Sequence, residues 1–198
     1  MSNGKLSSVL RGRDRALIGA VILANVIVVV GVVLLARSDD GENGQNDATE
    51  PSRKLPRAGR ALENRAIGVR IRKPRGWAHE RAGNSLVLRS PDSTTILSVS
   101  LPPGATSSAG VLRTAQAAIR REYRGVRVTP QSGRVADLPA VSVAISGINR
   151  KGTPLNIFVA AAEGRKRAWL VQVFSAPGAR SKRLAEAQVA IGTLRLSG

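Results

Sequence analysis

The stretch Ala66-Ile-Gly-Val-Arg-Ile-Arg-Lys-Pro-Arg-Gly-Trp77 decides how the C-terminal two thirds of the chain folds. Ile67, Val69 and Ile71 alternate with glycine and arginine, which is the period of a strand that buries one face and exposes the other. Pro74 and Gly76 then stop the strand. The pattern therefore predicts a half-buried strand followed by a turn.

Further segments with a two-residue period follow, and turn residues at Ser90–Ser93 and Asn149–Gly152 separate some of them. These segments are Leu86–Leu88, Ile96–Leu101, Val126–Val128, Val141–Ile145, Leu155–Val159 and Trp169–Val173. Because the connections are of hairpin length, we expect an antiparallel sheet of about six strands. Trp169 shares a face with two valines and is expected to be buried.

Two amphipathic segments are expected to form helices that flank this sheet. The first runs from a cap at Ser107 or Ser108 to about Tyr123, and the second runs from about Ser181 to Leu194. The residues expected to face inward are Leu112, Ala115, Ile119 and Tyr123 in the first helix, and Leu184, Ala187, Ile191 and Leu194 in the second. Strands and helices together predict an α+β domain over residues 64–198.

Several stretches of this domain resemble the PsbP-like fold. They are Gly68-Val-Arg-Ile-Arg-Lys-Pro-Arg-Gly-Trp77, the hairpin at Ser90–Ser93, Asp137-Leu-Pro-Ala140 before a strand, and Ala190-Ile-Gly-Thr-Leu-Arg-Leu196. That fold is shared by the photosystem II subunit PsbP, a Ran-binding nuclear import factor and bacterial envelope lipoproteins of the LpqN type. The resemblance implies an α/β/α sandwich and a binding or assembly role, with no shared catalytic set. The chain departs from the lipoproteins because it has no cysteine to carry a lipid.

Upstream of the domain, Ala16–Ala36 is a run of 21 residues without a charge. A helix of this length, at about 1.5 Å per residue, reaches roughly 32 Å and spans a hydrocarbon core of about 30 Å. A secretory signal has a shorter apolar region of about 7–15 residues, so the pattern favours an uncleaved signal anchor. Cleavage after Ser38, where small residues have the right spacing, is the alternative.

The charges that flank this span predict its orientation. Four basic residues precede the span, and only Arg37 follows it closely. We therefore expect residues 1–15 to be a short cytoplasmic tail and residues 64–198 to lie outside the cell membrane. Residues 37–63 are rich in Gly, Asn, Asp, Pro and Ser, and are expected to form a flexible linker.

Small residues inside the span suggest a way for two chains to associate. Ala16, Ala20 and Ala24 repeat every fourth residue, and Asn25 is the only strongly polar side chain. Such a row lets two helices approach closely, so a homodimer through this face is one hypothesis. The other is that alanine is simply abundant in this chain.

The formal net charge is +18, and from Arg53 onward 26 basic residues face only 7 acidic ones. Such a field attracts lipid headgroups, acidic polymers or an acidic protein. The competing explanation is compositional bias, because 25 of the 31 basic residues are arginine. The candidate polyanion contact is the outer side of the first helix, with Arg113, Arg120, Arg121 and Arg124. No nucleic-acid-binding motif accompanies it, so no specific nucleic acid is expected.

The sequence shows no catalytic motif and predicts no metal or cofactor. The chain has no cysteine and one histidine, which excludes thiolate zinc sites, cysteine nucleophiles and multi-histidine metal sites. It lacks G-x-S-x-G, H-E-x-x-H, Walker and dinucleotide motifs. His79 beside Glu80 is the only acid–base neighbour pair and is expected in an exposed loop. Trp77 and Trp169 either stack on a ligand or, as their setting favours, pack in the core.

Two functions are compatible with these observations. The first is a non-catalytic, membrane-anchored module of the cell envelope that binds a protein or an acidic polymer. The second is an envelope hydrolase whose carboxylates meet only in the folded chain. The structure can discriminate between them, because an enzyme needs convergent carboxylates, or His79 with a partner, in a concave pocket.

Overall fold

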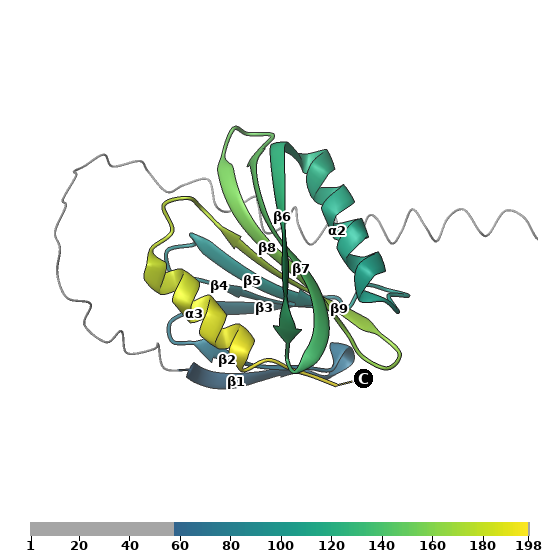
Figure 1. The fold of residues 1–198 in the computed structure, drawn as a ribbon. Helices are drawn as coiled ribbons and strands as arrows, with labels where there is room; N and C mark the ends of the chain where they lie inside the picture. The colour runs from purple at the N-terminus through teal and green to yellow at the C-terminus, as the bar shows by residue number, and fades with distance from the viewer. Residues whose placement is uncertain (1–57, 198) are drawn as a thin grey trace, which may run out of the picture.

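The structure, a computed structural model, describes residues 58–197 (Figure 1). These residues form two antiparallel sheets, two α-helices and one short 3-10 helix. The strands are β1 (Ala58–Asn64), β2 (Val69–Pro74), β3 (Ala78–Ala82), β4 (Ser85–Arg89), β5 (Thr95–Ser100), β6 (Tyr123–Val135), β7 (Leu138–Asn149), β8 (Pro154–Glu163), β9 (Ala168–Ser175) and β10 (Arg195–Leu196). The helices are η2 (Arg65–Ile67), α2 (Ser108–Glu122) and α3 (Ser181–Gly192).

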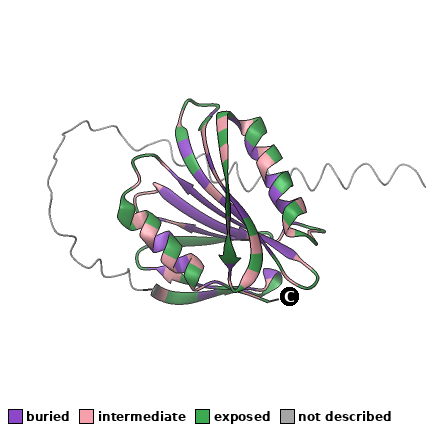
Figure 2. Cartoon of the chain, in the orientation of Figure 1, coloured by how far each residue is buried: buried purple, intermediate pink, exposed green. Residues whose placement is uncertain are grey.

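The elements are arranged in layers around the larger sheet, whose strand order is β3-β4-β5-β9-β8-β7-β6. Helix α2 covers one face over β6–β9 (Figure 1). The opposite face packs against α3 and the smaller sheet, whose order is β1-β2-β10. Figure 2 shows that the buried positions concentrate along the central strands. The predicted α+β architecture with antiparallel pairing and two helices is confirmed for the described residues.

Strand alternation sorts the side chains into two hydrophobic clusters, one on each face of the larger sheet. Ile145, Ile157 and Leu170 pack toward α2, whereas Leu97, Val99 and Val171 pack toward α3 and the smaller sheet. The register supports this sorting, because directly paired residues such as Val99 and Val171 project from the same face. The main sheet is therefore buried on both sides along its centre.

Both tryptophans belong to the core. Trp77 and Trp169 each expose only 1% of their surface. The indole N–H of Trp169 donates to the carbonyl of Ile67 at 2.8 Å, and that of Trp77 donates to Glu186 at 2.8 Å. The predicted burial of Trp169 is confirmed, and the idea of an exposed stacking platform is wrong for both residues.

Helix α2 begins and ends where its sequence predicts. The Ser107 hydroxyl caps it by accepting the N–H of Gly110 at 3.2 Å. The Glu163 carboxylate accepts the backbone N–H of Ser108 at 2.8 Å and its hydroxyl at 2.9 Å, and these bonds lower the pKa of Glu163. Leu112, Ala115 and Ile119 are buried on the inner side, as expected. Two independent capping groups thus fix the first turn of the helix.

The strand count was underestimated, because the larger sheet has seven strands and a second sheet adds three. Residues 58–63 were expected in the linker but belong to β1, and His79 was expected in a loop but lies on β3. Neither strand shows apolar alternation: β1 reads AGRALEN and β3 reads AHERA. Both are edge strands: β1 is held by backbone pairing with β2, and β3 by pairing with β4. The sequence pattern also does not predict β10, which has two residues.

The inward face of α3 differs from the predicted one. Ala187 is buried together with Glu186 and Ala190, and Leu194 beyond the helix is fully buried. Leu184, however, is 37% exposed, and Ile191 is only half-buried. The predicted inward face is therefore correct for Ala187 and Leu194, whereas Leu184 and Ile191 line a groove.

The predicted membrane span Ala16–Ala36 lies outside the described residues, as do the N-terminal tail, residues 37–57 of the linker and the proposed dimer face of Ala16, Ala20 and Ala24. Among residues 58–197, no helix has both the length and the apolar character that a membrane crossing requires. The span and its orientation therefore stay predictions.

Candidate functional site

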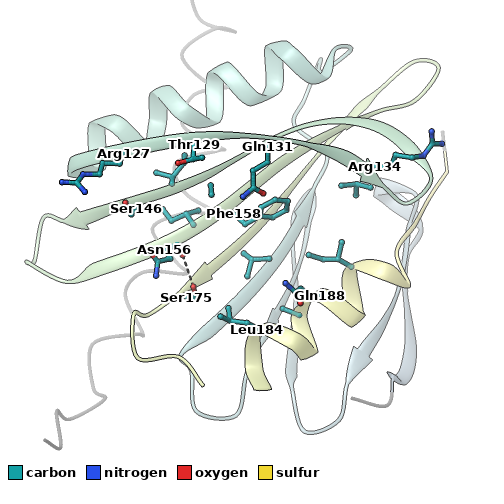
Figure 3. Close-up of a pocket in the computed structure, with 17 residues that line it drawn as sticks. Arg127, Thr129, Gln131, Arg134, Ser146, Asn156, Phe158, Ser175, Leu184 and Gln188 are labelled. Atoms are coloured by element: carbon teal, nitrogen blue, oxygen red, sulfur yellow. Dashed lines mark hydrogen bonds between the residues drawn. The ribbon is translucent and has the colours of Figure 1, made fainter. Parts of the chain in front are cut away.

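A groove of about 560 Å³ lies between α3 and the face of the larger sheet that points away from α2. Figure 3 shows β6 along one rim, α3 along the other, and β7, β8 and β9 beneath them. Phe158 lies on the floor, and Leu184 and Gln188 reach up from α3. The groove is open to solvent and large enough for a chain segment or a small ligand.

Strand alternation explains why this face of the sheet is polar enough to stay open. On β6, β7 and β8 the residues directed at α2 are apolar, as with Val128, Ile145 and Ile157. Their neighbours in sequence point the other way and line the groove with hydroxyl and amide groups. These polar lining residues are Thr129, Gln131, Ser146, Asn156 and Ser175. If this face were strictly apolar, α3 would have to cover it along its whole length to shield it from water.

A partly buried ion-pair network holds α3 in the position that forms the second rim. The Arg183 guanidinium donates to Asp92 at 2.9 Å and to Glu186 at 2.9 Å. Glu186 also accepts the indole N–H of Trp77, so the helix is tied to the core and to the β4–β5 turn. Burial alone would raise the pKa of the Asp92 carboxyl, but hydrogen bonds from Ser90, Arg183 and Thr94 outweigh it and hold that pKa well below its usual range.

The groove contains donors and acceptors but no acid–base pair. Its described lining residues include no aspartate, glutamate, histidine, lysine or cysteine. The Ser175 hydroxyl donates to the backbone carbonyl of Asn156 at 3.3 Å, and no general base stands beside it. Arg127 and Arg134 are the charged members of the lining and lie far apart along β6 (Figure 3). The arrangement can bind and orient a ligand through amides, hydroxyls and apolar contacts.

The carboxylates of the described residues do not converge on an open pocket. Asp92 and Glu186 approach one another only through Arg183, which already neutralises both. His79 and Glu80 are exposed and adjacent on β3, so their side chains point to opposite faces of the sheet. Residues 58–197 contain no group of three or more His, Cys, Asp or Glu side chains that could hold a metal ion. The pair of His79 and Glu80 is therefore unsuited to joint acid–base chemistry.

The four arginines of the predicted polyanion contact lie away from the groove. Arg113, Arg120 and Arg121 are exposed on α2, and Arg124 is exposed at the start of β6. Within residues 58–197 none of these side chains forms an ion pair. Near them, Arg150 donates to the backbone carbonyl of Arg121 and to the Glu122 carboxylate. The predicted helix face is therefore correct for three of the arginines, whereas Arg124 lies beyond the end of α2 on β6. Binding of a polyanion by these four residues stays a prediction.

No sequence pattern predicts the groove directly, although one signal is present. The groove face of β6–β8 carries amide and hydroxyl residues such as Gln131, Ser146 and Asn156. Polar alternation alone indicates only that a face is not core. The choice between open solvent and a sheltered groove depends on where α3 docks, which a strand pattern does not encode.

Comparisons with known proteins give fold similarity only. No protein-family model matches the chain, and no curated protein matches it. A structure from Bacteroides thetaiotaomicron aligns with a TM-score of 0.52 and 14% identity over 72% of this chain, which spans half the length of that protein. Cyanobacterial PsbP from Synechocystis aligns with a TM-score of 0.49 and 9% identity, over 76% of this chain and 98% of its own.

LpqN from Mycobacterium tuberculosis, described as involved in cell envelope biogenesis, aligns with a TM-score of 0.43 and 11% identity over 66% of this chain and 83% of its own. PsbP and LpqN belong to two of the three groups that the sequence resemblance names. These alignments are in line with the resemblance stated from the sequence. Identities this low describe fold alone and leave function to the site.

Proposed function

We propose that this chain is a membrane-anchored, extracytoplasmic binding module whose groove holds a segment of a partner protein. The observation that carries the proposal is the lining of the groove between β6–β9 and α3. Phe158, Leu184 and Ile191 give it an apolar floor and wall, and amides and hydroxyls stand along its rims. Apolar side chains with convergent polar groups are what a binding site for a protein segment requires.

A catalytic role finds no support in the same groove. A hydrolase of the envelope would need two carboxylates facing one bond, or a histidine with a partner. Within the described residues that line the groove, neither arrangement occurs. Binding without chemistry is the simpler account of a site built from amides, hydroxyls and apolar groups.

A protein segment suits the groove better than an acidic polymer does. A polyanion needs a row of closely spaced cations, because each phosphate or carboxylate has to be matched. The groove offers Arg127 and Arg134 at separate ends of one rim, with apolar side chains between the rims. The arginines of α2 suit an anionic polymer better, and we assign any such contact to that helix.

Membrane attachment is the part of the proposal that rests on sequence. Ala16–Ala36 is long and uncharged, and its basic flank lies on the N-terminal side. The groove then lies outside the membrane, on a domain connected to the anchor by residues 37–57. Such an arrangement suits a module that recruits or positions another envelope protein.

Photocrosslinking from within the groove tests this proposal. We would replace Gln188 by a photoreactive residue in the full-length chain, irradiate intact cells and identify the adducts. Leu184→Glu in the same chain places a charge in the groove wall, and Val141→Glu is its matched control, since Val141 is 38% exposed and Leu184 is 37% exposed. Val141 is not among the residues of the groove.

We expect one predominant protein adduct, reduced about tenfold or more by Leu184→Glu and unchanged by Val141→Glu. Losing the burial of one leucine side chain costs about 1.5–3 kcal/mol, which corresponds to at least a tenfold loss of affinity. An adduct that survives Leu184→Glu, or that both variants weaken equally, contradicts the groove as the binding site.

A further inference from the structure

A smaller pocket of about 280 Å³ lies at the C-terminal end of α3, beside the smaller sheet. It shares no residue with the groove. Its lining consists of Arg70, Ile71 and Arg72 from β2, Gly192 and Thr193 from the end of α3, and Arg195 from β10. Half of these six residues are arginines.

The register of the smaller sheet brings the three guanidinium groups to one face. Arg195 is paired directly with Arg70 in the antiparallel ladder between β10 and β2, so the two side chains project from the same face. Arg72 follows Arg70 by two residues and therefore points the same way. Like charges in directly opposite positions repel one another. The strand register thus holds three positive charges close together in spite of their mutual repulsion.

This positive charge is largely uncompensated among residues 58–197. The side chains of Arg70 and Arg72 are exposed and make no hydrogen bond or ion pair with another described residue. Glu63 is paired with Arg70 across β1 and β2, but its carboxylate bonds Arg65 at 3.0 Å. Arg195 donates to the carbonyl of Leu194 and lies 4.0 Å from an exposed Asp137 carboxylate. Within residues 58–197, at least two guanidinium groups therefore have no partner and can bind a ligand.

The walls of the pocket are held by contacts between distant parts of the chain. The Thr193 hydroxyl accepts the backbone N–H of Arg72 at 2.9 Å and donates to the carbonyl of Ala190 at 2.7 Å. Ile71, between the two arginines of β2, is buried in the core. The backbones that carry the arginines are thus fixed relative to the end of α3, so that a ligand meets a formed site.

We propose that this pocket binds a phosphate group. A guanidinium presents two parallel N–H donors to an oxyanion, and a phosphate offers enough oxygens for several guanidinium groups at once, whereas one or two arginines saturate a carboxylate. The phosphate belongs either to a free ion or to a lipid headgroup, because the site recognises the same chemistry in both. The proposal is independent of the groove and of its partner.

The first arm of the test uses inorganic phosphate. The full-length chain, isotope-labelled and held in non-ionic detergent micelles, is titrated with phosphate at constant ionic strength while the amide resonances of Gly192 and Arg195 are followed. We expect saturable shifts there, and smaller shifts with acetate. The double variant Arg70→Gln/Arg195→Gln is expected to weaken binding about tenfold for each guanidinium removed. Lys151→Gln/Arg180→Gln, which removes the same charge from exposed positions outside the pocket, is expected to leave it unchanged.

The second arm uses the chain in nanodiscs of phosphatidylcholine, with or without phosphatidic acid. If a headgroup is the ligand, the same resonances shift only with phosphatidic acid and only when Arg70 and Arg195 are present. Arg70→Lys/Arg195→Lys keeps the charge and the packing but loses bidentate geometry, so an intermediate affinity supports the site even if the glutamine variant folds poorly. Absence of a response in both arms overturns the proposal. Equal weakening by Arg70→Gln/Arg195→Gln and by Lys151→Gln/Arg180→Gln also overturns it, because it would show only the general electrostatic attraction of a basic protein.

Discussion

Arg183 is the residue on which the position of α3 depends most directly. Its guanidinium bridges Asp92 in the β4–β5 turn and Glu186 on its own helix, and it is largely shielded from solvent. Both carboxylates raise the pKa of Arg183, which keeps it charged at any pH at which the domain is folded. One side chain thus connects a turn, a helix and, through Glu186, the buried indole of Trp77.

Replacing Asp92 by asparagine should loosen this connection. We expect Asp92→Asn to lower the free energy of unfolding by about 1–3 kcal/mol, between the small contribution of an exposed ion pair and the larger cost of breaking a buried one. Lys182→Gln removes a charge from an exposed position of the same helix and should change stability by less than about 0.5 kcal/mol. Chemical denaturation of the two variants measures the difference. Equal effects would mean that the Asp92 bridge adds nothing specific.

The same carboxylate predicts how stability depends on pH. Its pKa is depressed in the folded state, whereas in the unfolded chain it titrates near the ordinary value of 3.8. The stabilisation is therefore complete above about pH 5 and decreases as the pH falls below 4 toward the folded-state pKa. Between pH 5 and pH 2 the wild type should lose stability more steeply than Asp92→Asn. Parallel pH profiles would contradict the assignment.

At the scale of single elements, α2 joins a buried inner face to a row of arginines on its outer side. The helix C-terminus adds partial negative charge near Arg120 and Arg121, which favours cations there even without a ligand. Structure alone therefore gives these residues a local reason to be basic. A binding experiment has to separate this local role from recognition of an external polyanion.

Charge reversal on α2 makes that separation. Each basic residue close to an anionic lipid surface contributes about 1 kcal/mol to binding. The electrostatic attraction decays over a Debye length of about 8 Å at physiological salt. We expect Arg120→Glu/Arg121→Glu/Arg124→Glu to reduce the amount of full-length chain that sediments with an acidic polymer. Binding of the wild type should also fall steeply as the salt concentration rises. The matched control is Arg165→Glu/Lys166→Glu/Arg180→Glu, which alters exposed positions in the β8–β9 and β9–α3 connections. If the control is equally impaired, α2 is not the preferred contact.

Elements were predictable from sequence where one side of them meets the core. The alternating valines of β7–β9 and the stripe of Leu112, Ala115 and Ile119 on α2 are examples. β1 and β3 escaped prediction because backbone pairing, and not an apolar face, holds them in place. The groove could not be predicted from the sequence for a related reason. Leu184 and Ile191 have the spacing of core residues, and only the docking of α3 leaves them beside open space.

For the whole molecule, the testable question is which side of the membrane carries the domain. Protease added to protoplasts should remove the C-terminal domain and spare the N-terminal tail, because the basic flank of Ala16–Ala36 is retained inside. An epitope tag at each end and immunoblotting would follow both parts. A detergent-lysed sample shows that the tail is itself cleavable. Protection of the domain in intact protoplasts would reverse the predicted orientation.

The pairing of β10 with β2 has a consequence for how the protein is made. β2 is synthesised early in the domain, yet the group that accepts the N–H of Arg72 lies 121 residues further along the chain. Contacts of such long sequence separation form late, because a large loop has to close first. During synthesis one edge of β2 therefore stays unpaired until Arg195 and Leu196 have been added. Chains interrupted before Arg195 would lack one wall of the three-arginine pocket, so phosphate binding would distinguish chains that contain β10 from chains that do not.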